Sequence, residues 1–230
     1  VDTVYAGYKN NSINKIFNQE RNNNTFINGK SNIINIGGSI IIDNGSDTIK
    51  YGFNTDIKKP SIIKNVIGKE NNKYNVFSND NILKYTGKNT IYPINRNTVT
   101  DWDGMKHIIE YVYKHKLGIK NLEDNGVVMT EPPNNKKEIR EQMFSVMFEY
   151  YNTPNFYLLN SALANFYYAG KTKDDYGLIV DCGYGNTNIS SIYMGMYLKE
   201  HSYNINIAGK DITNELLTSM KHESMYFHLD

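Results

Sequence analysis

Two short segments of this sequence share one plan. "IIIDNGSDT" (residues 40–48) and "LIVDCGYGN" (residues 178–186) each place three aliphatic residues before an aspartate, then any residue, then a glycine. Three aliphatic residues in a row are typical of a buried strand, and the Asp-X-Gly that follows is typical of a tight turn. One such segment is a weak signal, whereas two indicate an internal duplication. The chain is therefore expected to carry two related hairpins.

Each of these turns has the chemistry to hold an anion. A tight glycine turn between strands leaves backbone N–H groups pointing outward, and they form a concave site for phosphate oxygens. If the two turns face each other, they can grip a polyphosphate, and the strand-end residues Asp43 and Asp181 would face its bound cation. Turn chemistry alone fits two structural hairpins that bind nothing equally well. A third glycine turn, at Gly209, precedes Asp211, which we interpret as a helix cap.

Length and charge exclude several classes of protein. The 230 residues fit one large domain or two small ones. With 25 Lys and Arg against 24 Asp and Glu, the chain has no general attraction for nucleic acid or an anionic membrane. Its one cysteine, Cys182, excludes an internal disulfide and favours an intracellular compartment. No apolar run approaches the roughly 20 residues that span a bilayer.

Strand-like and helix-like segments alternate along the chain, which predicts an α/β architecture. The helices are recognised by apolar residues at helical spacing, and Asp101 or Asp103 is expected to cap the first of them. The strands are recognised by short aliphatic runs that end at turn residues. The predicted elements are a hairpin over 39–53, helices over 100–115, 136–151 and 155–170, strands at 126–133, 178–180 and 189–193, and a strand, turn and helix over 204–220.

From about residue 39 to residue 220, the sequence resembles actin and the actin-related proteins. The stretches that carry the resemblance, in the family's order, are "IIIDNGSDTIKYGF", "YPINRNTVTDWDGM", "MTEPPNNKKEIREQMFSVMFEYYNTPNFYL", "IVDCGYGNTNISSIYMG" and "NIAGKDITNELL". The first and fourth look like the two phosphate loops of that family. The resemblance implies an actin-like (ribonuclease-H-like) ATPase fold, here its N-terminal lobe, with a mixed sheet flanked by helices.

The resemblance also implies a division of the chain into parts. Residues 1–37 form a polar, Asn-rich extension that we expect to be flexible. Residues 38–170 correspond to subdomain 1, with a shortened subdomain 2 insert at about 64–92. Residues 171–230 correspond to the second phosphate loop and the start of subdomain 3. The rest of subdomain 3 and all of subdomain 4 are not represented, which favours a fragment of a longer protein over an unusually short relative.

A nucleotide, ATP or ADP with Mg²⁺ or Ca²⁺, is implied between the two lobes. Asp43 and Asp181 would lie near the metal and act through its waters, and Asp181 is also a catalytic candidate. Lys50 is the strongest single candidate for a phosphate contact, because an ammonium group is a compact phosphate partner. The residues expected to hold phosphates are Gly45, Ser46, Asp47 and Lys50 in the first loop, and Gly183, Tyr184, Gly185, Asn186 and Thr187 in the second.

Four positions depart from the family's pattern. Asp47 occupies a place that normally holds glycine beside the terminal phosphate, where a carboxylate about 4 Å away costs roughly 4 kcal/mol at a dielectric near 20. Ser161 stands where the family has the glutamine that orients the attacking water, and Asn160 is rotated from it by about 100° on a helix. Tyr184 replaces an acid, and Asn188 replaces a histidine. These departures predict weak nucleotide binding and little hydrolysis.

Three functions are compatible with the resemblance. The first is an actin-related subunit that acts as a scaffold in a larger assembly, with other protein subunits, such as actin or actin-related proteins, as its partners. Its location would be the cytoplasm, with the cytoskeleton, or the nucleus, where actin folds also serve chromatin remodelling. The second is an active Mg-ATPase of the wider family that includes sugar kinases and heat-shock chaperones. The third is a polymerising cytoskeletal actin, which the short segment between residues 68 and 92 argues against. Neither nucleic acid nor a membrane is expected as a direct partner.

Overall fold

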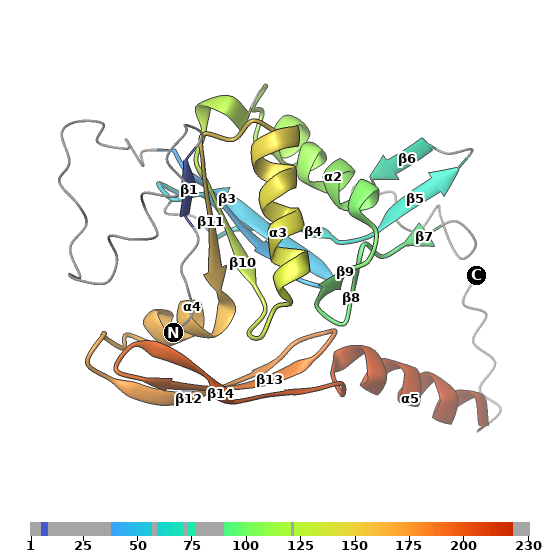
Figure 1. Cartoon of the computed structure of the whole chain (residues 1–230). Helices are drawn as coiled ribbons and strands as arrows, with labels where there is room; N and C mark the ends of the chain where they lie inside the picture. The colour runs from blue at the N-terminus through green and yellow to red at the C-terminus, as the bar shows by residue number, and fades with distance from the viewer. Residues whose placement is uncertain are drawn as a thin grey trace.

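The centre of the molecule is a six-stranded mixed sheet in the order β1-β11-β10-β2-β3-β4 (Figure 1). The structure is a computed structural model and describes residues 6–8, 38–56, 59–70, 73–76, 90–120 and 122–222. Apart from strand β1, the extension predicted over residues 1–37 lies outside the described residues. The strands of the central sheet are β1 (Ala6–Tyr8), β2 (Ile40–Asn44), β3 (Thr48–Phe53), β4 (Ser61–Lys64), β10 (Val127–Glu131) and β11 (Asn155–Asn160).

Strand β10 runs parallel to both of its neighbours, β2 and β11, while the other pairs in this sheet are antiparallel. Side chains alternate between the two faces of a strand, so β2 and β10 bury every second residue on the face that packs into the core. Ile40 pairs with Val127 and Ile42 with Met129, and all four side chains lie in the core. The predicted hairpin over 39–53 is confirmed by the antiparallel pairing of β2 with β3.

Two helices pack on one face of the central sheet (Figure 1). Helix α2 (Trp102–Tyr111) begins after Asp101, whose carboxylate accepts a hydrogen bond from the backbone N–H of Gly104 at 2.9 Å. That contact confirms the predicted cap. Helix α3 (Lys137–Ser145) buries Met143, and each helix continues in a π-helical turn, Val112–Lys116 and Val146–Tyr150. A short 3-10 turn, Leu122–Asp124, precedes β10.

Two small antiparallel units follow β4 in the chain. The strands β5 (Ile67–Glu70), β6 (Lys73–Val76) and β7 (Thr90–Ile91) form a three-stranded sheet, and β8 (Ile94–Asn95) pairs with β9 (Thr98–Val99). Arg96 and Asn97 form the two-residue turn of the β8–β9 hairpin, with φ angles of 50° and 60°. Two positive φ angles in succession are the requirement of a type I′ turn.

The helix predicted over residues 155–170 is wrong in its first half. Residues 155–160 form strand β11, and helix α4 (Ser161–Tyr168) begins only after it. Burial alternates along β11, with Phe156 and Leu158 in the core, and the strand pairs in parallel with β10. This tertiary pairing overrides a local sequence that is compatible with a helix.

A second lobe contains the sheet of β12 (Tyr176–Cys182), β13 (Thr187–Tyr193) and β14 (Met196–Ile205), followed by helix α5 (Gly209–His222). Helix α4 lies between this sheet and the central one (Figure 1). One face of the β12–β14 sheet is buried, through residues such as Ser190 and Ile192. The other face is exposed, and the prediction of a buried strand at 178–180 is wrong for Leu178 and Val180, which are 62% and 57% exposed.

None of the helices in the described part of the chain combines the length and the apolar character that crossing a membrane requires.

Candidate phosphate and metal site

The turns of the two related hairpins lie against each other. A Cβ atom added to Gly185 in the β12–β13 turn would lie 2.7 Å from the Ser46 Oγ in the β2–β3 turn, and 3.0 Å from the Asn97 Oδ1. Real Cβ atoms do not approach that closely, so glycine at residue 185 permits this contact with Ser46 and Asn97 in their present positions. The two segments that share a sequence plan are therefore brought together in space.

Asp43 is the next-to-last residue of β2 and is held by two side-chain contacts. The Lys50 Nζ lies 2.7 Å from one carboxylate oxygen, and the Thr130 hydroxyl donates to the other at 2.7 Å. The Thr130 Oγ1 in turn accepts a hydrogen bond from the backbone N–H of Asn44 at 3.1 Å. The Asp43–Lys50 contact follows from the hairpin register, which places these two residues opposite each other. Thr130 lies on the neighbouring strand β10, and the sequence reasoning missed it.

Asp181 is the next-to-last residue of β12 and lies near Asp43. Burial raises the pKa of the Asp181 carboxyl, the negative charge of Asp43 raises it further, and the Lys50 ammonium partly opposes both effects. Two carboxylates thus share the field of one ammonium group, and a divalent cation between them would relieve their repulsion.

These residues fit a metal ion that is bound jointly with phosphates. Within the described residues, no cluster of three or more His, Cys, Asp or Glu side chains could hold a metal alone. Mg²⁺ is commonly bound by one or two carboxylates, with phosphate oxygens and waters completing its octahedron. Asp43 and Asp181 supply that number of carboxylates at the ends of facing strands.

The backbone of both turns is suited to anions. In the part of the chain that the structure describes, no acceptor is found for the N–H groups of Ser46, Asp47, Tyr184 and Gly185. A Cβ on Gly45 would lie 2.6 Å from a backbone oxygen of its own turn, so the turn requires glycine there. Successive N–H groups without acceptors in a glycine turn form an anion-binding concavity.

The Asp47 carboxylate is paired with a lysine. The Lys64 Nζ lies 3.0 Å and 2.8 Å from its two oxygens, so the charge expected to repel a terminal phosphate has a counter-ion. The sequence reasoning missed Lys64 as well. Tyr184 lies near enough to this pair to be affected by both charges. Burial raises the pKa of the Tyr184 hydroxyl, the charge of Asp47 raises it further, and the charge of Lys64 lowers it.

Side chains later in the second turn are engaged inside their own lobe. The Asn186 amide contacts the side chains of Asn204 and Asn206 at 2.6 Å and 3.1 Å. The Thr187 hydroxyl donates to the backbone oxygen of Ile207 at 2.7 Å. These contacts join β13 to β14 and to the segment before α5, so they fix the shape of the turn.

The two candidates for water orientation have different environments. Asn160 uses its amide oxygen as the cap of α4, accepting a hydrogen bond from the Ala162 N–H at 2.9 Å. Ser161 is the first residue of that helix.

Asn188 pairs with Asp181 in the hairpin and is 3% exposed, and its amide oxygen has no partner within the described residues. A buried amide oxygen without a protein partner is commonly satisfied by water.

Arg96 connects the first lobe to the second and was not predicted from the sequence. Its guanidinium donates to the Gly185 backbone oxygen at 2.9 Å and forms a two-point contact with Asp211. Asp211 is the third residue of α5 and not the residue before the helix, so it is not the cap that the sequence predicted. Its carboxylate instead accepts a hydrogen bond from the N–H of Ala208, just before the helix, at 2.9 Å, as the third residue does in a capping box. The hydrogen bond from Arg96 is the main reason that the pKa of Asp211 is lowered to about 2.

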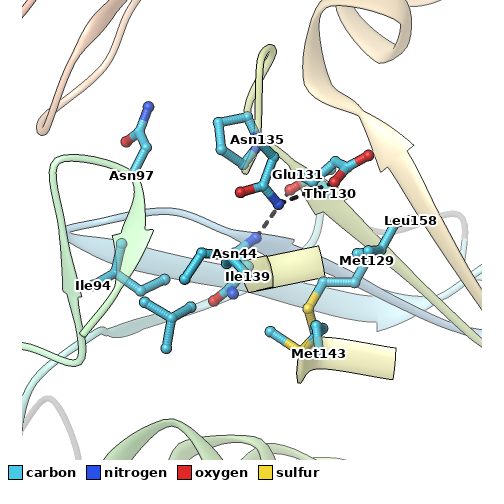
Figure 2. Close-up of a pocket in the computed structure, with 12 residues that line it drawn as sticks. Asn44, Ile94, Asn97, Met129, Thr130, Glu131, Asn135, Ile139, Met143 and Leu158 are labelled. Carbon is cyan, nitrogen blue, oxygen red and sulfur yellow. Dashed lines mark hydrogen bonds between the residues drawn. The ribbon is translucent and has the colours of Figure 1, made fainter. Parts of the chain in front are cut away.

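A small cavity, lined by both apolar and polar side chains, lies beside Asn44, the last residue of β2 (Figure 2). Its volume is about 30 Å³, which is enough for one or two waters. Asn44, Asn97, Thr130 and Asn135 line it together with apolar side chains that include Met129. The buried Asn44 Oδ1 has no partner among the described residues, and a water in this cavity would satisfy it.

The fold and these turns define an α/β protein in which two related hairpins, one from each lobe, meet at their glycine turns. The model of the actin family matches residues 36–228, and the chain belongs to that family. It is 34% identical over 188 residues to centractin from Saccharomyces cerevisiae, a match that covers 77% of this chain and 48% of centractin. The chain thus spans about half the length of this curated relative. Its predicted actin-like α/β fold is confirmed.

Proposed function

We propose that this chain is the phosphate-holding part of an actin-related protein and binds ATP or ADP with Mg²⁺ or Ca²⁺ between its two turns. The observation that carries the proposal is that Asp43 and Asp181 lie near each other and near one ammonium group, that of Lys50. The glycine turns that follow these two aspartates are in close contact. Actin-family proteins generally bind a nucleotide with a divalent cation, which supports the assignment.

In this proposal each group has a defined part. Lys50 and the N–H groups of both turns contact phosphate oxygens, and Asp43 and Asp181 orient the waters of the metal. The hydrogen bond from Thr130 to Asp43 Oδ1 fixes the orientation of the carboxylate, and with it the position of Oδ2. When bound, the cation supplies positive charge that stabilises the phosphates. Gly45 and Gly185 permit the close approach of backbone that these contacts require.

We further propose that hydrolysis is slow and that the protein acts mainly as a scaffold subunit. Orienting an attacking water takes an amide or another polar group of the right reach. Ser161 is short, and the Asn160 amide oxygen is already the cap of α4. The partners would be other subunits, such as actin or actin-related proteins, in a cytoskeletal or nuclear assembly. The similarity to centractin supports an actin-related role.

The exposed face of the β12–β14 sheet supports contact with further polypeptide. Its apolar side chains are more than half exposed, and contiguous apolar surface of this kind marks places where protein packs. They are Tyr176, Leu178, Val180, Tyr193, Met196 and Tyr203.

Calorimetric titration with Mg-ATP and Mg-ADP tests the proposal. The wild-type protein should bind at least one nucleotide, and Lys50→Ala should weaken binding by about tenfold or more, since one charged contact is worth roughly 1.5–3 kcal/mol. Lys137→Ala is the control, because that lysine belongs to a surface ion pair with Glu141. Absence of binding to both nucleotides would refute the proposed function, whereas tight binding with steady phosphate release would refute only slow hydrolysis.

A further inference from the structure

Asp47 in the first turn forms an ion pair with Lys64 at the end of the neighbouring strand β4. Asp47 and Lys64 have side chains that are 29% and 46% exposed, and both carboxylate oxygens contact the same ammonium. Lys64 is the last residue of β4, and β4 pairs with β3, the strand that leaves the turn. The pair therefore lies at the edge of the candidate phosphate site.

Asn65, the residue after Lys64, forms hydrogen bonds with the backbone of the same turn. It is fully buried, its side-chain amide donates to the Gly45 oxygen at 2.7 Å, and its own N–H donates to the Asp47 oxygen at 2.7 Å. Two of the three carbonyl groups of the turn, those of Gly45 and Asp47, thus accept hydrogen bonds from Asn65. The geometry of the turn therefore rests on Asn65, and Lys64 contributes charge.

We propose that Asp47 and Lys64 form a specificity pair that sets the preference of the site between nucleoside triphosphates and diphosphates. The inference rests on the proposed function. A bare carboxylate in this turn would repel the additional negative charge of a terminal phosphate. Lys64 neutralises that carboxylate, so the triphosphate is tolerated while the pair is intact. A diphosphate ends one phosphate earlier and experiences less of this charge.

The second turn supplies no positive charge to Asp47, so Lys64 is the counter-ion of the Asp47 carboxylate among the described residues. Tyr184 lies near the pair in the second turn, where burial raises the pKa of its hydroxyl and the charge of Asp47 raises it further. Ser46, next in the chain to Asp47, is committed to Asn97, with its hydroxyl donating to the Asn97 Oδ1 at 2.8 Å. Among the described residues, the cation in contact with Asp47 is Lys64.

The test is a double-mutant cycle measured by calorimetry, with Mg-ATP and Mg-ADP as ligands. Lys64→Met should lower the affinity for ATP about tenfold more than the affinity for ADP, since it exposes the Asp47 charge. Asp47→Gly should raise the ATP preference, and the double variant should return it to near the wild-type ratio. Lys64→Arg keeps the charge and should keep the ratio.

A purely structural role for Lys64 would give a different result. In that case Lys64→Met would weaken ATP and ADP equally, and the ratio of the two dissociation constants would not move. That outcome overturns the specificity pair and leaves nucleotide binding intact. If the wild-type protein binds neither nucleotide, both proposals fall. Lys114→Met is the matched control, because Lys114 is 43% exposed and paired with Glu110 on α2.

Discussion

Arg96 donates to both carboxylate oxygens of Asp211, with Nη1–Oδ2 at 2.6 Å and Nη2–Oδ1 at 2.5 Å. Arg96 lies at the tip of the β8–β9 hairpin in the first lobe, and Asp211 lies in the first turn of α5 in the second. The same guanidinium contacts the Gly185 oxygen, while the backbone N–H of Asn97 donates to the Ser46 hydroxyl. One hairpin tip therefore contacts the glycine turns of both lobes.

Replacing Arg96 should loosen the contact between the lobes. Arg96→Ala is expected to lower the melting temperature by a few degrees, because the guanidinium makes hydrogen bonds to three residues of the second lobe. Arg96→Lys should recover only part of the loss, since an ammonium cannot make the two-point contact with a carboxylate. Differential scanning calorimetry measures both. Melting temperatures of both variants equal to wild type would show that the Arg96 contacts do not stabilise the fold.

The Asp211 carboxyl should make stability depend on pH in the acid range. Its pKa is about 2 in the folded protein against an ordinary value of 3.8, so the unfolded chain binds a proton more readily than the folded one. The stabilisation is therefore complete above about pH 4 and is lost as the pH falls toward 2. Urea denaturation at pH 5 and pH 3 should show a smaller loss of stability for Asp211→Asn than for wild type. Equal losses in the two proteins would contradict this assignment.

Close contact between the two turns predicts that even one methyl group disturbs the site. Gly185→Ala places a Cβ 2.7 Å from the Ser46 Oγ and 3.2 Å from its Cβ, so the Ser46 side chain must move out of its contact with Asn97 or the turns must separate. We expect weaker nucleotide binding with a melting temperature close to that of the wild type, because the change is confined to two turns. Ser46→Gly in the same protein removes the obstructing hydroxyl and should restore part of the affinity. Calorimetric titration of the single and double variants checks this, and unchanged affinity in Gly185→Ala would disprove it.

The features that could be predicted from the sequence are local. The repeated Asp-X-Gly plan predicted both hairpins, and the register of a hairpin then places Lys50 opposite Asp43. The sequence predicted Asp101 or Asp103 as the cap of α2, and the structure shows Asp101, because capping depends on residues a few positions away. Each of these predictions uses only neighbours in the chain.

The features that were missed depend on contacts between distant segments. Thr130 reaches Asp43 only because β10 lies beside β2, and Arg96 reaches Asp211 across 115 positions of sequence. Strand β11 was mistaken for helix because its pairing with β10 decided the outcome. Lys64 could have been noticed once Asp47 was recognised as an unusual charge in a phosphate turn, because such a charge needs a partner.

A buried ion pair at the end of β10 should be important for stability. Arg140 contacts both carboxylate oxygens of Glu131, at 2.7 Å and 3.0 Å, and the Glu131 side chain is 6% exposed. Arg140→Ala leaves that carboxylate without its counter-ion, so we expect a loss of about 3 kcal/mol in the free energy of unfolding. Chemical denaturation measures it.

The adjacent surface pair is the control for this prediction. Lys137 and Glu141 have side chains that are 75% and 64% exposed, so Lys137→Ala should change stability by about 0.5 kcal/mol or less. Similar losses in the Lys137 and Arg140 variants would argue that burial does not distinguish the two pairs.

Ser161 should limit hydrolysis if the remainder of the site is intact. Ser161→Gln places a side-chain amide of the family's length at the start of α4, one residue after the capping Asn160. Because a positioned polar group typically contributes about 10²-fold or more, we expect phosphate release from Mg-ATP to rise by at least about tenfold. Ser161→Ala is the control, since it removes the hydroxyl without supplying an amide and should leave the slow rate unchanged. If Ser161→Gln binds ATP as tightly as wild type and still releases phosphate no faster, the block lies elsewhere, and Asn188, with its unpartnered buried oxygen, is the next position to examine.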